Sequence, residues 1–195
     1  MKISNRIINL KAKPKKLLAA LDSENGQMTL AEGPVFADGA FELNLPDIVV
    51  GYSYLSTLKN ICENINIEPE SLKIAVVDAF WLFDSNKTLI GYIFQGSTQA
   101  AISGRLGEKM VSRWYANQSS QIYGTARCGP NGMAVNFKLN LKKGWNEVIR
   151  QFQPDATVSI HTSQNSESLF WFMSEDKKAQ KIPSPYRFMF TFERF

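Results

Sequence analysis

Apolar and polar positions alternate most clearly between Met133 and Phe152. Four apolar residues are interleaved with three polar ones: Val135, Asn136, Phe137, Lys138, Leu139, Asn140 and Leu141. This period of two is typical of a strand with one buried face and one wet face. Lys142-Lys143-Gly144 then supplies a short polar turn, and 145–152 can return to the core. The pattern predicts a β-hairpin with a three-residue loop.

The first 45 residues read as short strands broken by turns. We expect strands at 3–10, 16–21, 28–31 and 40–45. The segments between them are rich in residues that adopt turn conformations at low cost: Asp22-Ser23-Glu24-Asn25-Gly26, Glu32-Gly33-Pro34 and Asp38-Gly39. Strands at this spacing are typical of a sandwich or a barrel.

The next segment has a different period. Leu55, Leu58, Ile61, Cys62 and Ile65 fall at helical spacing, which predicts a short helix that ends before Pro69.

The stretch 74–83 is apolar almost throughout, so it predicts a strand buried on both faces. Asp78 in its middle needs a partner if it is buried. Residues 84–87 predict a turn, and 88–95 should pair back as the next strand. Over 96–111, an irregular connection and a helix both remain open, because Gly104 and Gly107 each weaken a helix by ~1 kcal/mol.

Further strands are expected at 110–115, 121–127, 157–161, 169–173 and 186–195. Together these elements predict a mostly β protein, a two-sheet antiparallel sandwich or a barrel-like fold with one or two short helices. We expect one domain over 1–195, with 1–46 and 74–195 as a possible subdivision.

Composition adds two limits. A chain of 195 residues can bury a core without metals or disulfides, and its net charge of +4 is mild. Part of that charge lies in the runs 11–16 and 177–181, which favour solvated loops or strand edges over nucleic-acid binding. No apolar run approaches the ~20 residues that a membrane helix requires.

Cys62 and Cys128 are the only cysteines, and their spacing fits no metal motif. They could form a disulfide or remain thiols, and we expect buried free thiols. Nothing after Met1 reads as a signal peptide. Either the protein is cytoplasmic, or Met1 replaces a leader that the natural precursor carries.

Two separated motifs resemble a known family. VFADGAFELNLP at 35–46, and SRWYANQSSQIYGTARC with FKLNLKKGWNEVI at 112–128 and 137–149, are similar to bacterial cell-envelope lipoproteins of the type common in deinococci. The first motif also resembles the carboxypeptidase-regulatory type of β-sandwich, a non-catalytic module. The resemblance implies an extracytoplasmic protein whose precursor carries a lipidated cysteine upstream. Asn117 and Ser119 stand where that family tends to have acidic residues, so no ligand role is carried over.

Most catalytic classes lack their residues here. His161 is the only histidine, which excludes multi-histidine zinc sites, and neither a Walker loop nor a dinucleotide fingerprint is present. We expect no cofactor and no metal. Asp78 and Asp84 flank 80–83, so a carboxylate-dependent glycan hydrolase is an alternative. A buried structural Asp and a turn-forming Asp explain the same pattern more simply.

The aromatic residues suggest binding instead. The candidate ligand-binding residues are Trp81, Trp114, Tyr115, Trp145, Asp78 and Asp84, an aromatic platform with nearby acids. The favoured function is a non-enzymatic binding module of the cell envelope. Its partner would be an unknown ligand or envelope protein, a glycan among them, and it would meet the membrane only through a lipid anchor. An intracellular β-barrel adaptor remains a third alternative.

Overall fold

A computed structural model describes residues 1–11, 13–23, 26–49, 62–128, 132–163 and 169–175. Within them lie one five-residue 3-10 helix, η1 (Gln99–Ser103), and these strands: β1 (Lys2–Arg6), β2 (Lys16–Ser23), β3 (Gly26–Pro34), β4 (Ala40–Asn44), β5 (Cys62–Glu63), β6 (Asn66–Glu68), β7 (Ile74–Val77), β8 (Phe80–Phe83), β9 (Leu89–Gly96), β10 (Lys109–Ala116), β11 (Ser120–Cys128), β12 (Met133–Leu141), β13 (Gly144–Phe152), β14 (Val158–Thr162) and β15 (Phe170–Ser174). The predicted mostly β fold is confirmed.

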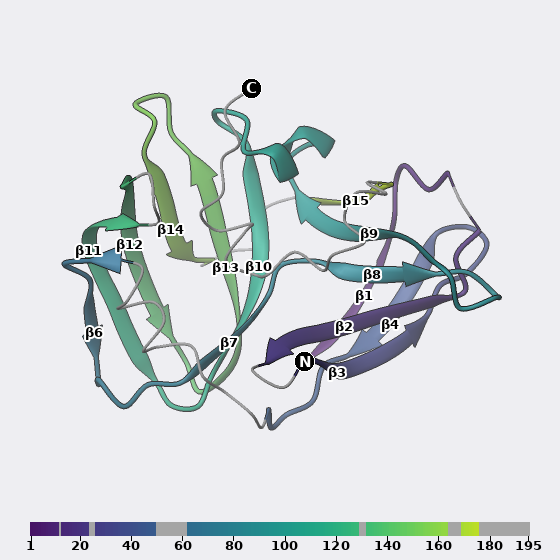
Figure 1. Ribbon diagram of the computed structural model, residues 1–195, viewed down its shortest axis with the longest axis horizontal. Coiled ribbons are helices and arrows are strands. Elements are labelled where there is room, and N and C mark those ends of the chain that lie inside the picture. The colour runs from purple at the N-terminus through teal and green to yellow at the C-terminus, as the bar shows by residue number, and fades with distance from the viewer. Residues whose placement is uncertain (12, 24–25, 50–61, 129–131, 164–168, 176–195) are drawn as a thin grey trace.

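The strands form two sheets. The large sheet runs β3-β2-β8-β9-β10-β13-β14-β12-β11-β5, with β15 added to β9, β6 to β11 and β7 to β10, while β1 and β4 form a separate pair. Figure 1 shows the large sheet folded about β10 into two halves, without closing into a barrel. We call them the β11 half (β5, β6, β7, β11, β12, β13 and β14) and the β2 half (β1, β2, β3, β4, β8, β9 and β15), with β10 shared between them.

Three hydrophobic clusters fill the interior. The first lies inside the β11 half, around Trp114 and Phe137. The second lies between the β1–β4 pair and the large sheet, around Phe41, Phe80 and Trp171. The third covers the opposite side of β8, β9 and β15, next to η1, around Phe94. The β2 half is therefore a sandwich with a further apolar layer outside it.

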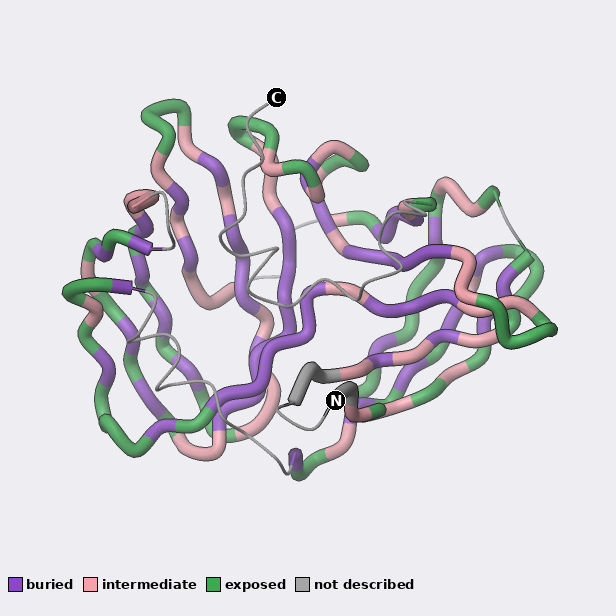
Figure 2. Tube along the Cα trace, viewed as in Figure 1, coloured by how far each residue is buried: buried purple, intermediate pink, exposed green. Residues whose placement is uncertain are grey.

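The apolar stretch 74–83 serves both halves. Ile74 and Val76 pack in the first cluster, Val77 and Phe80 in the second, and Trp81 in the third. Burial on both faces, as predicted, is thus confirmed, and Figure 2 shows the stretch buried as it crosses between the halves. The expected single strand is wrong, because it breaks after Val77: β7 pairs with β10, and β8 pairs with β2 and β9.

The predicted hairpin over 133–152 is wrong in its pairing. Strands β12 and β13 and the turn between them form where expected, and the alternation of buried and exposed residues in β12 is confirmed. However, β14 lies between them, parallel to β12 and antiparallel to β13. On their other sides, β12 pairs with β11 and β13 pairs with β10 over eight or more residues each. β12 and β13 diverge because each pairs along its length with a different strand, β12 with β11 and β13 with β10.

The structure confirms some of the other local predictions and contradicts others. Four N-terminal strands form near the expected places, although β1 ends at Arg6, and the turn at Asp38-Gly39 is confirmed, where Gly39 has a φ of 85°. The break expected at Glu32-Gly33-Pro34 is wrong, because these residues continue β3 and pair with Lys16 to Leu18 of β2. Residues 96–111, which the sequence left open, contain the short helix η1, capped by Thr98. The helix expected over 55–65 is wrong at Cys62–Glu63, which form β5; its residues 55–61, like the strand expected at 186–195, lie outside the described residues.

The expectation of free cysteines is also wrong. Cys62 and Cys128 face each other across β5 and β11 and form a disulfide, with their Cα atoms 4.1 Å apart. Both are buried in the first cluster. Their distance in sequence concealed the pairing, because it depends on β5 reaching the edge of β11.

Candidate functional site

The β10–β13 pair presents two different faces to the two halves. Arg113 lies opposite Glu147 in the ladder, and Met110 lies opposite Arg150. Because neighbouring residues of a strand point to opposite faces, Arg113 and Arg150 project in opposite directions. Each arginine is buried, and each has its own acidic neighbour.

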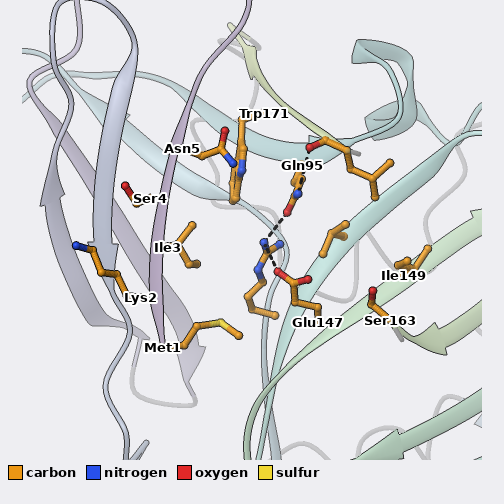
Figure 3. Close-up of a pocket in the computed structure, with 13 residues that line it drawn as sticks. Met1, Lys2, Ile3, Ser4, Asn5, Gln95, Glu147, Ile149, Ser163 and Trp171 are labelled. Atoms are coloured by element: carbon orange, nitrogen blue, oxygen red, sulfur yellow. Dashed lines mark hydrogen bonds and ion pairs between the residues drawn. The ribbon is translucent and has the colours of Figure 1, made fainter. Parts of the chain in front are cut away.

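A cavity of about 260 Å³ lies on the Arg113 face, between β1 and the β10–β13 pair. Its lining consists of Met1 to Asn5 on one wall, Val111, Arg113, Glu147 and Ile149 on the other, and Gln95, Ser163, Leu169 and Trp171. Figure 3 shows the β1 residues facing Glu147 and Ile149 across the space, with Gln95 and Trp171 at one end. Binding sites commonly occupy such boundaries between packed units.

Arg113 is held from three directions. Its Nη2 donates to Glu147 Oε1 at 3.0 Å and to Gln95 Oε1, and its guanidinium carbon lies 5.1 Å from the centre of the Trp171 ring. Only 4% of its side chain is exposed, against 39% for Glu147. Burial lowers the pKa of Arg113 to about 10, opposed by the nearby Glu147 charge and hydrogen bond. The guanidinium therefore stays charged at neutral pH.

This arrangement supplies charge and hydrogen bonds rather than a mobile proton. Arg113 Nε is buried without a hydrogen-bond partner. Glu147 uses Oε1 for Arg113, and within the described part of the chain its Oε2 accepts no hydrogen bond. The carboxylate is thus an accessible polar group beside the cavity, while the arginine behind it fixes its position.

The opposite face carries a second buried charge cluster. Ser112 donates to Asp78 Oδ1, Arg150 donates to Met110 Sδ at 3.2 Å, and Arg150 lies 5.4 Å from the Phe152 ring. Burial raises the pKa of Asp78, while the Arg150 charge and the Ser112 hydrogen bond oppose that rise. The prediction that a buried Asp78 would have a partner is confirmed.

Two aromatic residues fasten the segment after β4 to the β10–β13 pair. Trp145 Nε1 donates to the Pro46 carbonyl at 2.7 Å, and the Tyr115 hydroxyl donates to the Asp47 carbonyl at 3.3 Å. The two rings meet edge to face, with centroids 5.4 Å apart. This clamp holds the N-terminal sandwich strands next to the wall of the cavity.

The six sequence candidates do not gather at one place. Trp114 lies in the first cluster, Tyr115 and Trp145 in or against the second, and Trp81 in the third. Asp84 accepts the backbone N–H groups of Asn86 and Thr88 at 2.8 Å each, which confirms its turn-forming role. None of the six lines the cavity. Their participation in ligand binding stays a prediction.

Sequence reasoning missed the residues at the cavity. Arg113 carries the signal that identified Asp78, because it is a charged residue inside a mostly apolar strand. Glu147, Gln95 and Trp171 have no such signal, since they meet Arg113 only through the pairing of β10 with β13 and of β9 with β15. His161 is half-buried in β14, an interior strand rather than an edge.

No protein-family model, curated protein or solved structure matches this chain. Among the residues that the structure describes, no helix is long and apolar enough to cross a membrane, and no group of three His, Cys, Asp or Glu residues could hold a metal ion.

Proposed function

We propose that this chain is a non-enzymatic binding domain of the bacterial cell envelope, which takes a ligand or a partner protein into the cavity between its halves. The observation that carries the proposal is the pair of Arg113 and Glu147 at that cavity. A buried charge is costly unless it is well paired, and here the pair also places a carboxylate oxygen beside open space.

The disulfide supports a location outside the cytoplasm. Disulfides persist in oxidising compartments such as the periplasm and the cell surface, whereas cytosolic thiols are mostly kept reduced. Cys62 and Cys128 are both buried, as expected of a structural bond rather than a redox-active one.

The lipoprotein resemblance of the sequence motifs also favours this location, and several of the motif residues form turn and strand contacts. Asp38 accepts the Ala40 N–H at 3.1 Å and pairs with Arg6 at 2.6 Å. Trp145 forms the clamp on Pro46, and Asn146 binds the turn before it. The motifs thus mark turns and strand contacts, and the proposed kinship is one of architecture.

The location is tested by fractionating the native cells and determining the natural N-terminus by mass spectrometry. A lipid-modified cysteine upstream of Lys2, in the envelope fraction, is the expected result. An unmodified Met1 in the cytosol would overturn the lipoprotein proposal.

The binding role is tested on the ¹⁵N-labelled full chain by NMR. Two probes are added separately: soluble peptidoglycan fragments, and peptides selected on the immobilised chain from a random dodecapeptide display library. We expect at least one of them to shift the amide signals of Val111 and Ile149, in the cavity wall, and to leave those of β11 in place. If neither probe shifts the cavity signals, the binding proposal fails.

A further inference from the structure

The edge of β1 that faces away from β4 has free backbone groups. The N–H of Leu45 donates to the Met1 carbonyl at 2.9 Å and the N–H of Ile7 donates to the Gly39 carbonyl at 3.0 Å. In an antiparallel pair, such hydrogen-bonded positions alternate with positions whose N–H and C=O point away. By the register of β1 and β4, the outward-pointing groups belong to Lys2, Ser4 and Arg6. The Arg6 N–H is already used, because it donates to Asn5 Oδ1 at 2.8 Å.

The cavity follows this edge. Met1 to Asn5 all line it, although successive side chains of a strand point to opposite faces. A space that touches five consecutive residues therefore lies beside the edge of the strand rather than over one face. Within the described part of the chain, the outward N–H and C=O groups of Lys2 and Ser4 have no hydrogen-bond partner.

Strand β15 already uses the same edge further along. Ile7 bridges Trp171 in parallel, and the N–H of Ile8 donates to the Trp171 carbonyl at 3.0 Å. Trp171 also lines the cavity. The open part of the edge thus runs from Lys2 to Asn5 and ends at Trp171, a length that suits a short extended segment.

We propose that this cavity receives an extended peptide segment of a partner protein, which adds to β1 as a further strand. The inference rests on the proposed binding function and names its partner. The outward groups of Lys2 and Ser4 repeat every second residue, at a spacing of roughly 7 Å. A second backbone in the β conformation presents complementary groups at that same spacing, which glycan hydroxyls do not.

The far wall indicates which side chains the peptide carries. Val111 and Ile149 form an apolar surface opposite β1. Beside it, Glu147 Oε2 offers an acceptor, and the charge of its carboxylate is already balanced by Arg113. Because every second side chain of the peptide faces this wall, we expect apolar residues and a hydrogen-bond donor such as Ser, Thr or Lys at every second position.

The test uses dodecapeptides selected from the random display library on the immobilised full chain. We expect the selected peptides to carry such residues at every second position, and hydrogen exchange of the Lys2 and Ser4 amides to slow when the synthetic peptide binds. The variant Ser4→Pro removes one outward N–H, and a loss of about tenfold in affinity, ~1.4 kcal/mol, is expected. The ladder to β4 uses the odd-numbered residues, so this proline breaks none of its bonds.

Two controls show whether the affinity lost in Ser4→Pro comes from the missing N–H. Ser4→Ala changes the same side chain and keeps the N–H, so its affinity gives the contribution of the side chain alone. Near-UV circular dichroism shows whether Ser4→Pro is folded, and the exchange of the Lys2 amide tests the edge without any substitution.

Four results would overturn the inference. They are the absence of enriched peptides, binding unaffected by Ser4→Pro, protection of the Lys2 and Ser4 amides in the chain alone, and a dimer that buries β1 against a second copy. If peptidoglycan fragments bind the cavity and peptides do not, this inference fails while the proposed function stands.

Discussion

Arg113 and Arg150 are both buried positive charges in the β10–β13 pair, and their acidic neighbours balance these charges from different degrees of burial. Glu147 reaches Arg113 from a half-exposed position, whereas Asp78 is buried, like the Arg150 that it faces. A charge pair gains from a low dielectric only when both groups are otherwise satisfied. Asp78 Oδ2 has no hydrogen-bond partner, so the Asp78 cluster carries the greater desolvation cost.

Replacing Glu147 should therefore expose the cost of the buried guanidinium. In Glu147→Gln the charge of Arg113 loses its balancing carboxylate, and we expect a loss of about 2 kcal/mol in the free energy of unfolding, less than for a fully buried pair because Glu147 is partly solvated. Urea denaturation measures it. The control is Glu42→Gln, whose pair with Lys2 is exposed on both sides and should change stability by less than ~0.5 kcal/mol. Equal losses in the two variants would contradict a structural role for the Arg113 pair.

Asp78 should make stability depend on pH in the opposite sense to an ordinary carboxylate. Because burial raises its pKa in the folded state, the native protein binds more protons than the unfolded chain at pH values between the unfolded and folded pKa. Its contribution therefore grows as pH falls through the folded pKa, and is lost as pH rises through it. We expect the stability of the wild type relative to Asp78→Asn to increase on acidification, measured by urea denaturation at a series of pH values. A difference that does not vary with pH would contradict the raised pKa.

Single residues were predictable from the sequence where the reason was local. Asp84 was identified as a turn former because an Asp followed by Ser-Asn-Lys binds its own backbone. Asp78 was recognised as a buried group in need of a partner, but Ser112 could not be named, since it belongs to a strand that pairs with β7 only in the folded chain. The same dependence on pairing hid the partners of Arg113.

At the scale of elements, Asn146 fixes the turn between β12 and β13. Its Oδ1 accepts the Lys142 N–H at 2.9 Å, and its Nδ2 lies 2.8 Å from the Lys142 carbonyl, 2.9 Å from that of Gly144 and 3.3 Å from that of Trp114. One buried amide thus joins the turn to the neighbouring strand β10.

We expect Asn146→Ala to cost about 2 kcal/mol in the free energy of unfolding, because several buried backbone groups lose their partner at once. Urea denaturation again gives the value. Asn140→Ala is the matched control, an exposed asparagine in β12 that should change stability by about 0.5 kcal/mol at most. A similar loss in both variants would show that the turn does not depend on the Asn146 side chain.

The disulfide joins residues that are 66 positions apart, so it restricts the unfolded chain strongly. Replacing Cys62 and Cys128 together by serine should lower the free energy of unfolding by on the order of 4 kcal/mol, as chain-entropy arguments give for a loop of this length. Chemical denaturation of the oxidised protein and the double variant measures the difference. Reductant should destabilise the wild type alone; if it has no effect on the wild type, the bond is absent from the protein in solution.

Elements were predictable where short-range turn signals bounded them. Strands β1 to β4 follow one another in the predicted order and near the predicted places, but β3 runs through Glu32-Gly33-Pro34, where the sequence predicted a break. The predicted β12–β13 hairpin failed because the neighbours of a strand are decided by the whole sheet. The helical spacing ending at Cys62 and Ile65 misled for a related reason, since β5 is held as a strand by its pairing with β11.

At the scale of the whole molecule, the two halves share their interior. Trp145 of β13, in the β11 half, packs against the second cluster, and its ring meets that of Tyr115 with centroids 5.4 Å apart. The stretch 74–83 contributes to all three clusters. Shared packing of this kind couples the unfolding of the halves.

We therefore expect one cooperative thermal transition, with equal calorimetric and van't Hoff enthalpies. Calorimetry under oxidising conditions makes the comparison, and near-UV circular dichroism should give the same midpoint. Two separate transitions would instead mean that the β11 half and the β2 half fold independently.

The position of β14 between β12 and β13 also affects how the chain can fold during its synthesis on the ribosome. Both flanking strands leave the exit tunnel before the strand that belongs between them. The sheet can be completed only when the later strand enters the gap, so any early contact between the first two must open again. Biogenesis of the β11 half thus depends on a nascent segment that arrives last.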